Sequence, residues 1–124
     1  MLRDKPFVGM LLVTDAARAR AFYEGVLGLE VVYDDPFAVA LDAAGTSVRL
    51  AIVPEVPEPA GTNAGWLVTD IAATAHELFT QGVILERFPS LDQENNGVWT
   101  APGGDRIAWF RDPDGNRLSL TQPA

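Results

Sequence analysis

The tetrapeptide Leu-Val-Thr-Asp occurs twice in this 124-residue chain, at residues 12–15 and 67–70, so the second copy follows the first by 55 positions. Each copy ends an apolar run suited to a buried strand and precedes a stretch of helix-favouring residues. Asp15 and Asp70 therefore stand where helix N-caps are expected. Because residue identity and the order of strand and helix agree, we interpret the two copies as equivalent positions of an internal repeat.

The elements around these anchors follow the same order in each half. Three prolines and a glycine between residues 54 and 61 interrupt any ladder or helix, so this segment is predicted to link a first module at about 7–53 to a second at about 62–122. The first half is predicted to hold a strand at 8–13, a helix at 16–26 and strands at 29–33, 37–41 and 47–53. The second is predicted to hold a strand at 64–68, a helix at 71–81 and strands at 83–88, 98–101, 106–111 and 117–121, with an irregular segment near 91–97.

The predicted fold is therefore α+β: a single domain of two βαβββ modules whose curved mixed sheet carries its helices on the convex side. The concave side would form a cup-shaped cavity, where a small molecule would sit. The turn Asp112-Pro113-Asp114-Gly115-Asn116 is interpreted as architectural, since proline presets φ, glycine permits a positive φ, and Asp and Asn bond to the nearby backbone.

Composition excludes several classes of function. The chain has no cysteine, which rules out disulfides, thiolate catalysis and cysteine-based metal or iron–sulfur sites. Its net charge of −8, with nine scattered basic residues, argues against nucleic-acid binding. No apolar run is long enough to cross a bilayer, and the charged start does not look like a signal peptide, so we expect a cytoplasmic protein with no membrane partner.

Three stretches resemble a known family, the vicinal oxygen chelate superfamily, which contains glyoxalase I, extradiol dioxygenases, and fosfomycin- and bleomycin-resistance proteins. They are Asp15 followed by Phe22–Leu29, Trp66–Asp70 with its helix and Gly82, and Phe110–Asn116. Together they span nearly the whole chain. The resemblance implies a small-molecule ligand and a homodimer.

Metal-dependent members of that family offer a His on the first strand of each module and a Glu or other donor on the last strand. Alignment by the two Asp anchors places Val8 and Asn63 at the first pair of positions, and Arg49 and Ser119 at the second pair. Val8 has no donor atom, and the guanidinium of Arg49 is cationic with no lone pair to give. The resemblance therefore implies a member without the usual metal ligands, and we expect no metal and no other cofactor.

Strand alternation indicates which side chains would line the cavity. The candidate ligand-binding residues are Arg49, Asn63, Ser119, Met10, Trp99 and Trp109. A buried Arg49 needs a partner, which is either an anionic group of the ligand or an acid of the chain, and the sequence leaves both open. Asn63 and Ser119 would supply hydrogen bonds, and Trp99 or Trp109 would stack on a ligand or pack in the core or a dimer. Residues 90–97 are a candidate mobile loop over the site.

Three functions remain open at this stage. The leading hypothesis is a binding protein that sequesters a small organic molecule without a metal. The second is an enzyme, which would be a metal-dependent lyase, isomerase or dioxygenase with unfamiliar ligands, or would use Tyr33, Glu86 or Asp92 for acid–base chemistry without a metal. The third is a partner-binding or regulatory module whose cup is filled by side chains. The acidic composition suits a cationic ligand, whereas Arg49 suits an anionic one. The single histidine, His76, is predicted to face solvent on the side of its helix opposite Ala75, Leu78 and Phe79, so no catalytic residue is assigned.

Overall fold

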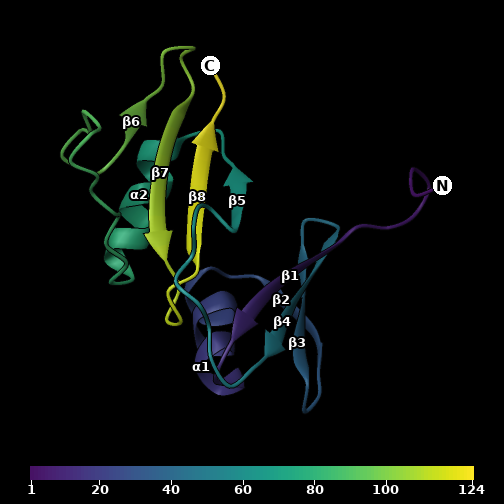
Figure 1. Ribbon diagram of the computed structural model, residues 1–124. Helices are drawn as coiled ribbons and strands as arrows, with labels where there is room; N and C mark the ends of the chain where they lie inside the picture. Colours follow the sequence, from purple (N-terminus) through teal and green to yellow (C-terminus); the bar gives the residue numbers. More distant parts are fainter. The chain divides into compact units, whose positions relative to one another are not determined.

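A computed structural model describes all residues 1–124, which form two compact units, Met1–Pro57 and Glu58–Ala124 (Figure 1). Each unit contains one helical segment and one four-stranded mixed sheet. The α+β class and the two βαβββ modules predicted from the repeat are confirmed. No helix in the chain has the length and apolar character needed to cross a membrane.

The first unit runs β1 (Val8–Val13), α1 (Ala16–Arg20), η1 (Ala21–Val26), β2 (Glu30–Asp34), β3 (Ala38–Ala43) and β4 (Thr46–Ile52). Its strand order is β1-β4-β3-β2, with β1 parallel to β4 and the other pairs antiparallel. Apolar side chains on alternate strand positions are buried beneath the helix, among them Val13, Leu41 and Leu50. The other face of the sheet is free of any helix of this unit.

The predicted single helix at 16–26 changes character at Ala21, where it becomes a π-helix. Phe22 and Tyr23 follow one another in the sequence, yet both are buried, with their rings edge to face at 5.2 Å. The wider π turn, in which the Leu27 amide donates to the Phe22 carbonyl, accommodates both rings against the sheet. Packing of two adjacent aromatic side chains is our physical account of this departure from the α-helix.

The second unit repeats this plan. It contains β5 (Ala64–Leu67), α2 (Ile71–Thr80), β6 (Trp99–Thr100), β7 (Arg106–Arg111) and β8 (Arg117–Gln122), in the sheet order β5-β8-β7-β6. Met10 pairs with Arg49 in the first unit, and Gly65 pairs with Ser119 in the second, at equivalent places of the two parallel ladders. The register therefore agrees with the alignment that the two Asp anchors gave.

Both Asp anchors cap their helices. Asp15 accepts a hydrogen bond from the Arg18 amide at 2.9 Å, and Asp70 accepts one from the Ala73 amide at 3.1 Å. These bonds satisfy amides that have no partner within the first helical turn.

The prediction of a strand at 83–88 is wrong, because these residues form no regular strand. This extended segment makes one backbone hydrogen bond to β7, from the Glu86 amide to the Trp109 carbonyl. The side chain of Gln93 makes hydrogen bonds that a neighbouring strand would otherwise make. Its nitrogen donates to the carbonyls of Glu86 and Gly97, and its oxygen accepts from the Phe88 amide. A side chain from the following loop has therefore satisfied the backbone groups that a neighbouring strand would have paired.

Two other expectations concern local detail. The turn at 112–116 is held by its own bonds, since Asp112 Oδ1 accepts from the amides of Asp114 and Asn116, which agrees with the architectural interpretation.

On α2, Ala75 and Leu78 are buried as predicted. The prediction that Phe79 belongs to the same buried face is wrong, because 69% of the surface of Phe79 is exposed. His76 is exposed, as predicted, but its predicted side is wrong, because it lines the same groove as Ala75 and Phe79 instead of lying opposite them.

Candidate functional site

The open face of the first sheet carries a row of side chains centred on Arg49. Strand register places Met10, Arg49, Ala40 and Tyr33 side by side on β1, β4, β3 and β2. Met10 is largely exposed, and Tyr33 is exposed over 45% of its surface, whereas Arg49 is half-buried. Met10 and Arg49, both candidate ligand-binding residues, are therefore direct neighbours across the parallel ladder.

Arg49 has no acidic partner within the first unit. Its Nε atom is buried and makes no hydrogen bond, and none of the ion pairs of the structure includes it. A buried donor without an acceptor costs free energy, and a cationic donor costs more than a neutral one. The first unit therefore supplies no acid to Arg49, and its Nε donor is left without an acceptor there.

The open face of the second sheet carries Ser119 and the two candidate tryptophans. Ser119 pairs with Gly65 on β5 and with Trp109 on β7, and Trp99 on β6 pairs with Ile107. A side chain at position 65 would overlap the Ser119 hydroxyl, so glycine leaves room for that group above the sheet. The rings of Trp99 and Trp109 are 6.2 Å apart.

A cavity of about 250 Å³ lies in this unit beside Trp109. Its lining combines Phe88, Leu91 and Trp109 with the charged Arg117, and the remainder comes from Gly61, Thr62 and Ser90. Phe88 meets Trp109 edge to face at 5.2 Å, and the guanidinium of Arg117 lies 5.4 Å from the centre of the Phe88 ring. The lining thus combines an aromatic wall with a cation at its side, in a small and open depression.

Glu86 holds the charged side of this cavity in place. Its carboxylate is 3.0 Å from Arg117 Nε and 3.2 Å from Arg111 Nε, while Arg111 also pairs with Glu58 at 2.8 Å. Burial alone would raise the pKa of Glu86, but the hydrogen bonds from Arg117 and Arg111 outweigh it and hold that pKa below its ordinary value. Glu86 is thus kept ionised and paired with two cations.

Asn63 lies one residue before β5, next to Arg117 on β8. Its side-chain Oδ1 accepts a hydrogen bond from the backbone amide of Arg117 at 3.0 Å. Its backbone amide donates to the Arg117 carbonyl at 2.8 Å. The side-chain oxygen of Asn63 therefore extends the pairing with β8, and only its side-chain nitrogen remains for a ligand. The ligand-binding role assigned to Asn63 from the sequence stays a prediction, as do those of Ser119, Met10, Trp99 and Trp109.

Sequence reasoning did not single out Phe88. It was assigned to a regular strand at 83–88, whereas the fold of residues 83–97 turns its ring toward Trp109. One sequence feature could have indicated this position of Phe88. The residue directly precedes residues 90–97, which are rich in Asp, Asn, Gln and Gly and therefore typical of an irregular loop.

The donor set at the four family positions does not fit a divalent metal ion. In the first unit Val8 and Arg49 provide no ligand atom, and in the second the oxygen of Asn63 is already bonded to the backbone of β8. Within neither unit do three or more His, Asp or Glu side chains gather as a metal site would require.

Comparison with known proteins fixes the family. The family model described as Glyoxalase/Bleomycin resistance protein/Dioxygenase superfamily matches residues 7–120. The chain belongs to this superfamily. The resemblance drawn from the three stretches of sequence is thereby confirmed.

Solved structures of superfamily proteins share this fold. A superfamily member from Sphaerobacter thermophilus is 26% identical with a TM-score of 0.76, and the match covers 98% of this chain and 99% of that one. A glyoxalase family protein from Enterococcus faecalis is 19% identical, with a TM-score of 0.76 and coverage of 98% and 100%. A lactoylglutathione lyase from Agrobacterium tumefaciens is 19% identical, with a TM-score of 0.73 and coverage of 96% and 93%. No curated protein matches the chain.

Proposed function

We propose that this superfamily member binds a small organic molecule carrying an anionic group, that it does so without a metal ion at the family positions, and that it acts by binding rather than by making or breaking bonds. The observation that carries the proposal is the guanidinium of Arg49, which is half-buried on the open face of the first sheet with its Nε atom unpaired.

The physical argument rests on what a buried guanidinium requires. Arg49 is flanked on its own face by Met10 and Ala40, whose side chains offer no hydrogen-bond acceptor beyond the weak one of the Met10 sulfur. A carboxylate or phosphonate could accept two parallel N–H bonds, the geometry that guanidinium groups favour. Because Arg49 stands where metal-dependent relatives have a ligand, its charge would meet the anionic oxygens that a metal ion would otherwise meet.

The overall charge of the protein does not oppose this assignment. The net charge of −8 produces a long-range field that slows the approach of anions, and salt screens that field over roughly 8–10 Å. A contact at about 3 Å is decided by the local partner, which here is a cation without an acid in its own unit. The aromatic cavity of the second unit supports small-molecule binding independently, through Phe88 and Trp109.

The test is a titration of chelator-treated protein with a panel of small aromatic carboxylates and phosphonates, followed by NMR of the Arg49 Nε–H group. The proposal expects members of the panel to shift this signal to saturation, and Arg49→Gln to weaken their binding about tenfold or more, as loss of charge-assisted bonds implies. Arg3→Gln, at an exposed position, is the matched control and should change nothing. Equal affinities for Arg49→Gln and the normal protein would remove Arg49 from the site.

A homodimer is part of the same proposal. Phe7, Met10 and Phe37 of the first unit expose most of their surface, and association of two copies would cover such apolar side chains. Light scattering at increasing protein concentration tests it, and a mass of one chain at all concentrations would refute it.

A further inference from the structure

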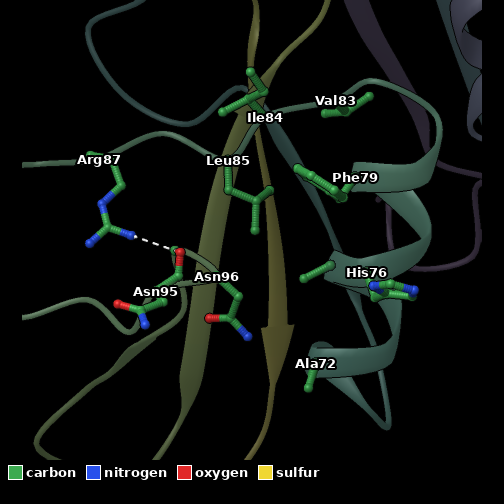
Figure 2. Close-up of a pocket in the computed structure, with 11 residues that line it drawn as sticks. Ala72, His76, Phe79, Val83, Ile84, Leu85, Arg87, Asn95 and Asn96 are labelled. Carbon is green, nitrogen blue, oxygen red and sulfur yellow. Dashed lines mark hydrogen bonds between the residues drawn. The ribbon is translucent and has the colours of Figure 1, made fainter.

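The second unit has another cavity, on the side of its sheet that α2 covers. It has a volume of about 580 Å³ and lies between one face of α2 and the two segments 83–87 and 95–97 (Figure 2). Leu85 and Glu86 point to opposite sides of their segment, so Leu85 faces this groove while Glu86 serves the open face with Arg117. The groove is therefore separate from the aromatic cavity beside Trp109 and goes beyond the function proposed above.

One stripe of α2 lines the groove. Ala72, Ala75, His76 and Phe79 stand at i, i+3, i+4 and i+7, which places them on a single helix face. Figure 2 shows Phe79 reaching from the helix toward Leu85 and Ile84 on the opposite wall. Phe79 and Ile84 are 69% and 80% exposed, so large apolar side chains stand in water at the rim of a concave surface.

The wall opposite the helix is fixed by its own bonds. Arg87 donates to the carbonyls of Gln93, Glu94 and Asn95, and the Asn96 side chain accepts from the Val98 amide. Gly97 packs so closely on Leu85 that an added Cβ would lie 2.8 Å from the Leu85 Cβ. The groove is thus formed before any ligand arrives, which lowers the entropic cost of binding.

The charge of the lining selects the ligand. Arg87 and His76 are the ionisable side chains that line the groove, and no Asp or Glu lines it, although the chain as a whole has a net charge of −8. The three acceptors that Arg87 holds account for three of its five N–H donors, which leaves two for an external group. The Asn95 amide lies beside it, as Figure 2 shows.

We propose that this groove binds a small amphipathic monocarboxylate, with its apolar body between Phe79, Ile84 and Leu85 and its carboxylate toward Arg87. A groove of this size, mostly apolar and with one cationic end, matches such a molecule in volume, polarity and charge. A neutral apolar molecule would gain nothing from the two remaining N–H donors of Arg87, and a cation would meet like charge.

The test uses decanoate as the probe and amide NMR of the full chain as the readout. We expect the amides of Ala72, Phe79, Ile84 and Arg87 to shift together, with a dissociation constant on the order of 1 mM, since a ligand of this size has few atoms to contribute. Decanol, which has the same chain without the charge, should bind about tenfold more weakly.

Variants locate the binding. Ala72→Trp should fill the groove and weaken decanoate binding at least about fivefold, whereas Ala73→Trp, on an exposed position of the same helix outside the groove, should leave it unchanged. Ile84→Ser removes an exposed apolar group without touching the core and should weaken binding as well. The absence of shifts, equal binding by Ala72→Trp and Ala73→Trp, or equal shifts at the exposed Phe7 and Phe37 would each overturn the proposal.

Discussion

Glu86 should contribute measurably to the stability of the second unit, and Glu86→Gln removes its charge with little change of shape. The carboxylate pairs with two guanidinium groups, and both it and Arg117 are mostly buried, with 21% and 17% of the side chain exposed. Removing one member of a partly buried ion pair leaves its partners unsatisfied, so we expect a loss of about 1–3 kcal/mol.

The effect should depend on pH with a definite sign. The pKa of Glu86 is lower in the folded protein than its ordinary value of 4.5, so the folded state binds the proton less readily than the unfolded state. Its contribution is therefore fully present above the unfolded pKa and is lost as pH falls through the lowered folded pKa. The difference in unfolding free energy between the normal protein and Glu86→Gln should be constant near neutral pH and shrink in acid.

The assay is urea unfolding at several pH values, followed by tryptophan fluorescence. All three tryptophans, Trp66, Trp99 and Trp109, belong to the second unit, so this signal reports the unit that contains Glu86. Glu58→Gln is the control, because Glu58 is 75% exposed and makes one ion pair, and it should cost no more than about 0.5 kcal/mol. A difference for Glu86→Gln that is near zero at neutral pH, or that grows in acid, would refute the reasoning.

Other predictions follow from local bonds. Asp15→Ala and Asp70→Ala should each cost about 1 kcal/mol of unfolding free energy, since each removes an observed N-cap bond, and a loss near zero for both would contradict the capping role. Ala44 has a φ of 49° in a tight turn, so Ala44→Gly should raise stability by up to about 1 kcal/mol in thermal or urea unfolding, and a loss would contradict the strain. Gln93→Leu removes three hydrogen bonds, so it should cost about 2 kcal/mol or more and speed hydrogen exchange of the Phe88 amide, which should otherwise remain protected.

Most of the fold could be predicted because its signals are local. The repeated tetrapeptide, the caps after each strand and the apolar alternation each depend on a few neighbouring residues, and the structure places β1, β5 and both helices within a residue or two of the predicted ranges. The parts of the fold that the sequence did not predict depend on contacts between residues that no local pattern brings together. The π turn arises from packing of Phe22 and Tyr23 on the sheet, and the loss of the strand at 83–88 arises from Gln93, whose role no local pattern indicates.

The site was predictable to the extent that it lies on regular strands. Alternation along β1, β4 and β8 put Met10, Arg49 and Ser119 on open faces, and the strand register agrees. Phe88 was missed because it lies on an irregular segment, where side-chain direction does not follow a period of two. Whether Arg49 meets an acid of the chain was also beyond the sequence, because any of seventeen acidic residues was a possible partner until the fold placed them.

Metal titration of the chelator-treated protein tests the central claim most directly. Manganese, iron(II), nickel and zinc are added in turn, thermal unfolding is recorded, and the metal content of the untreated protein is measured. Binding without a metal predicts no stoichiometric ion and no upward shift of the melting temperature. One ion per chain with an increase of about 2.7 kcal/mol at one hundred times its dissociation constant would contradict the claim and indicate a metal-dependent enzyme.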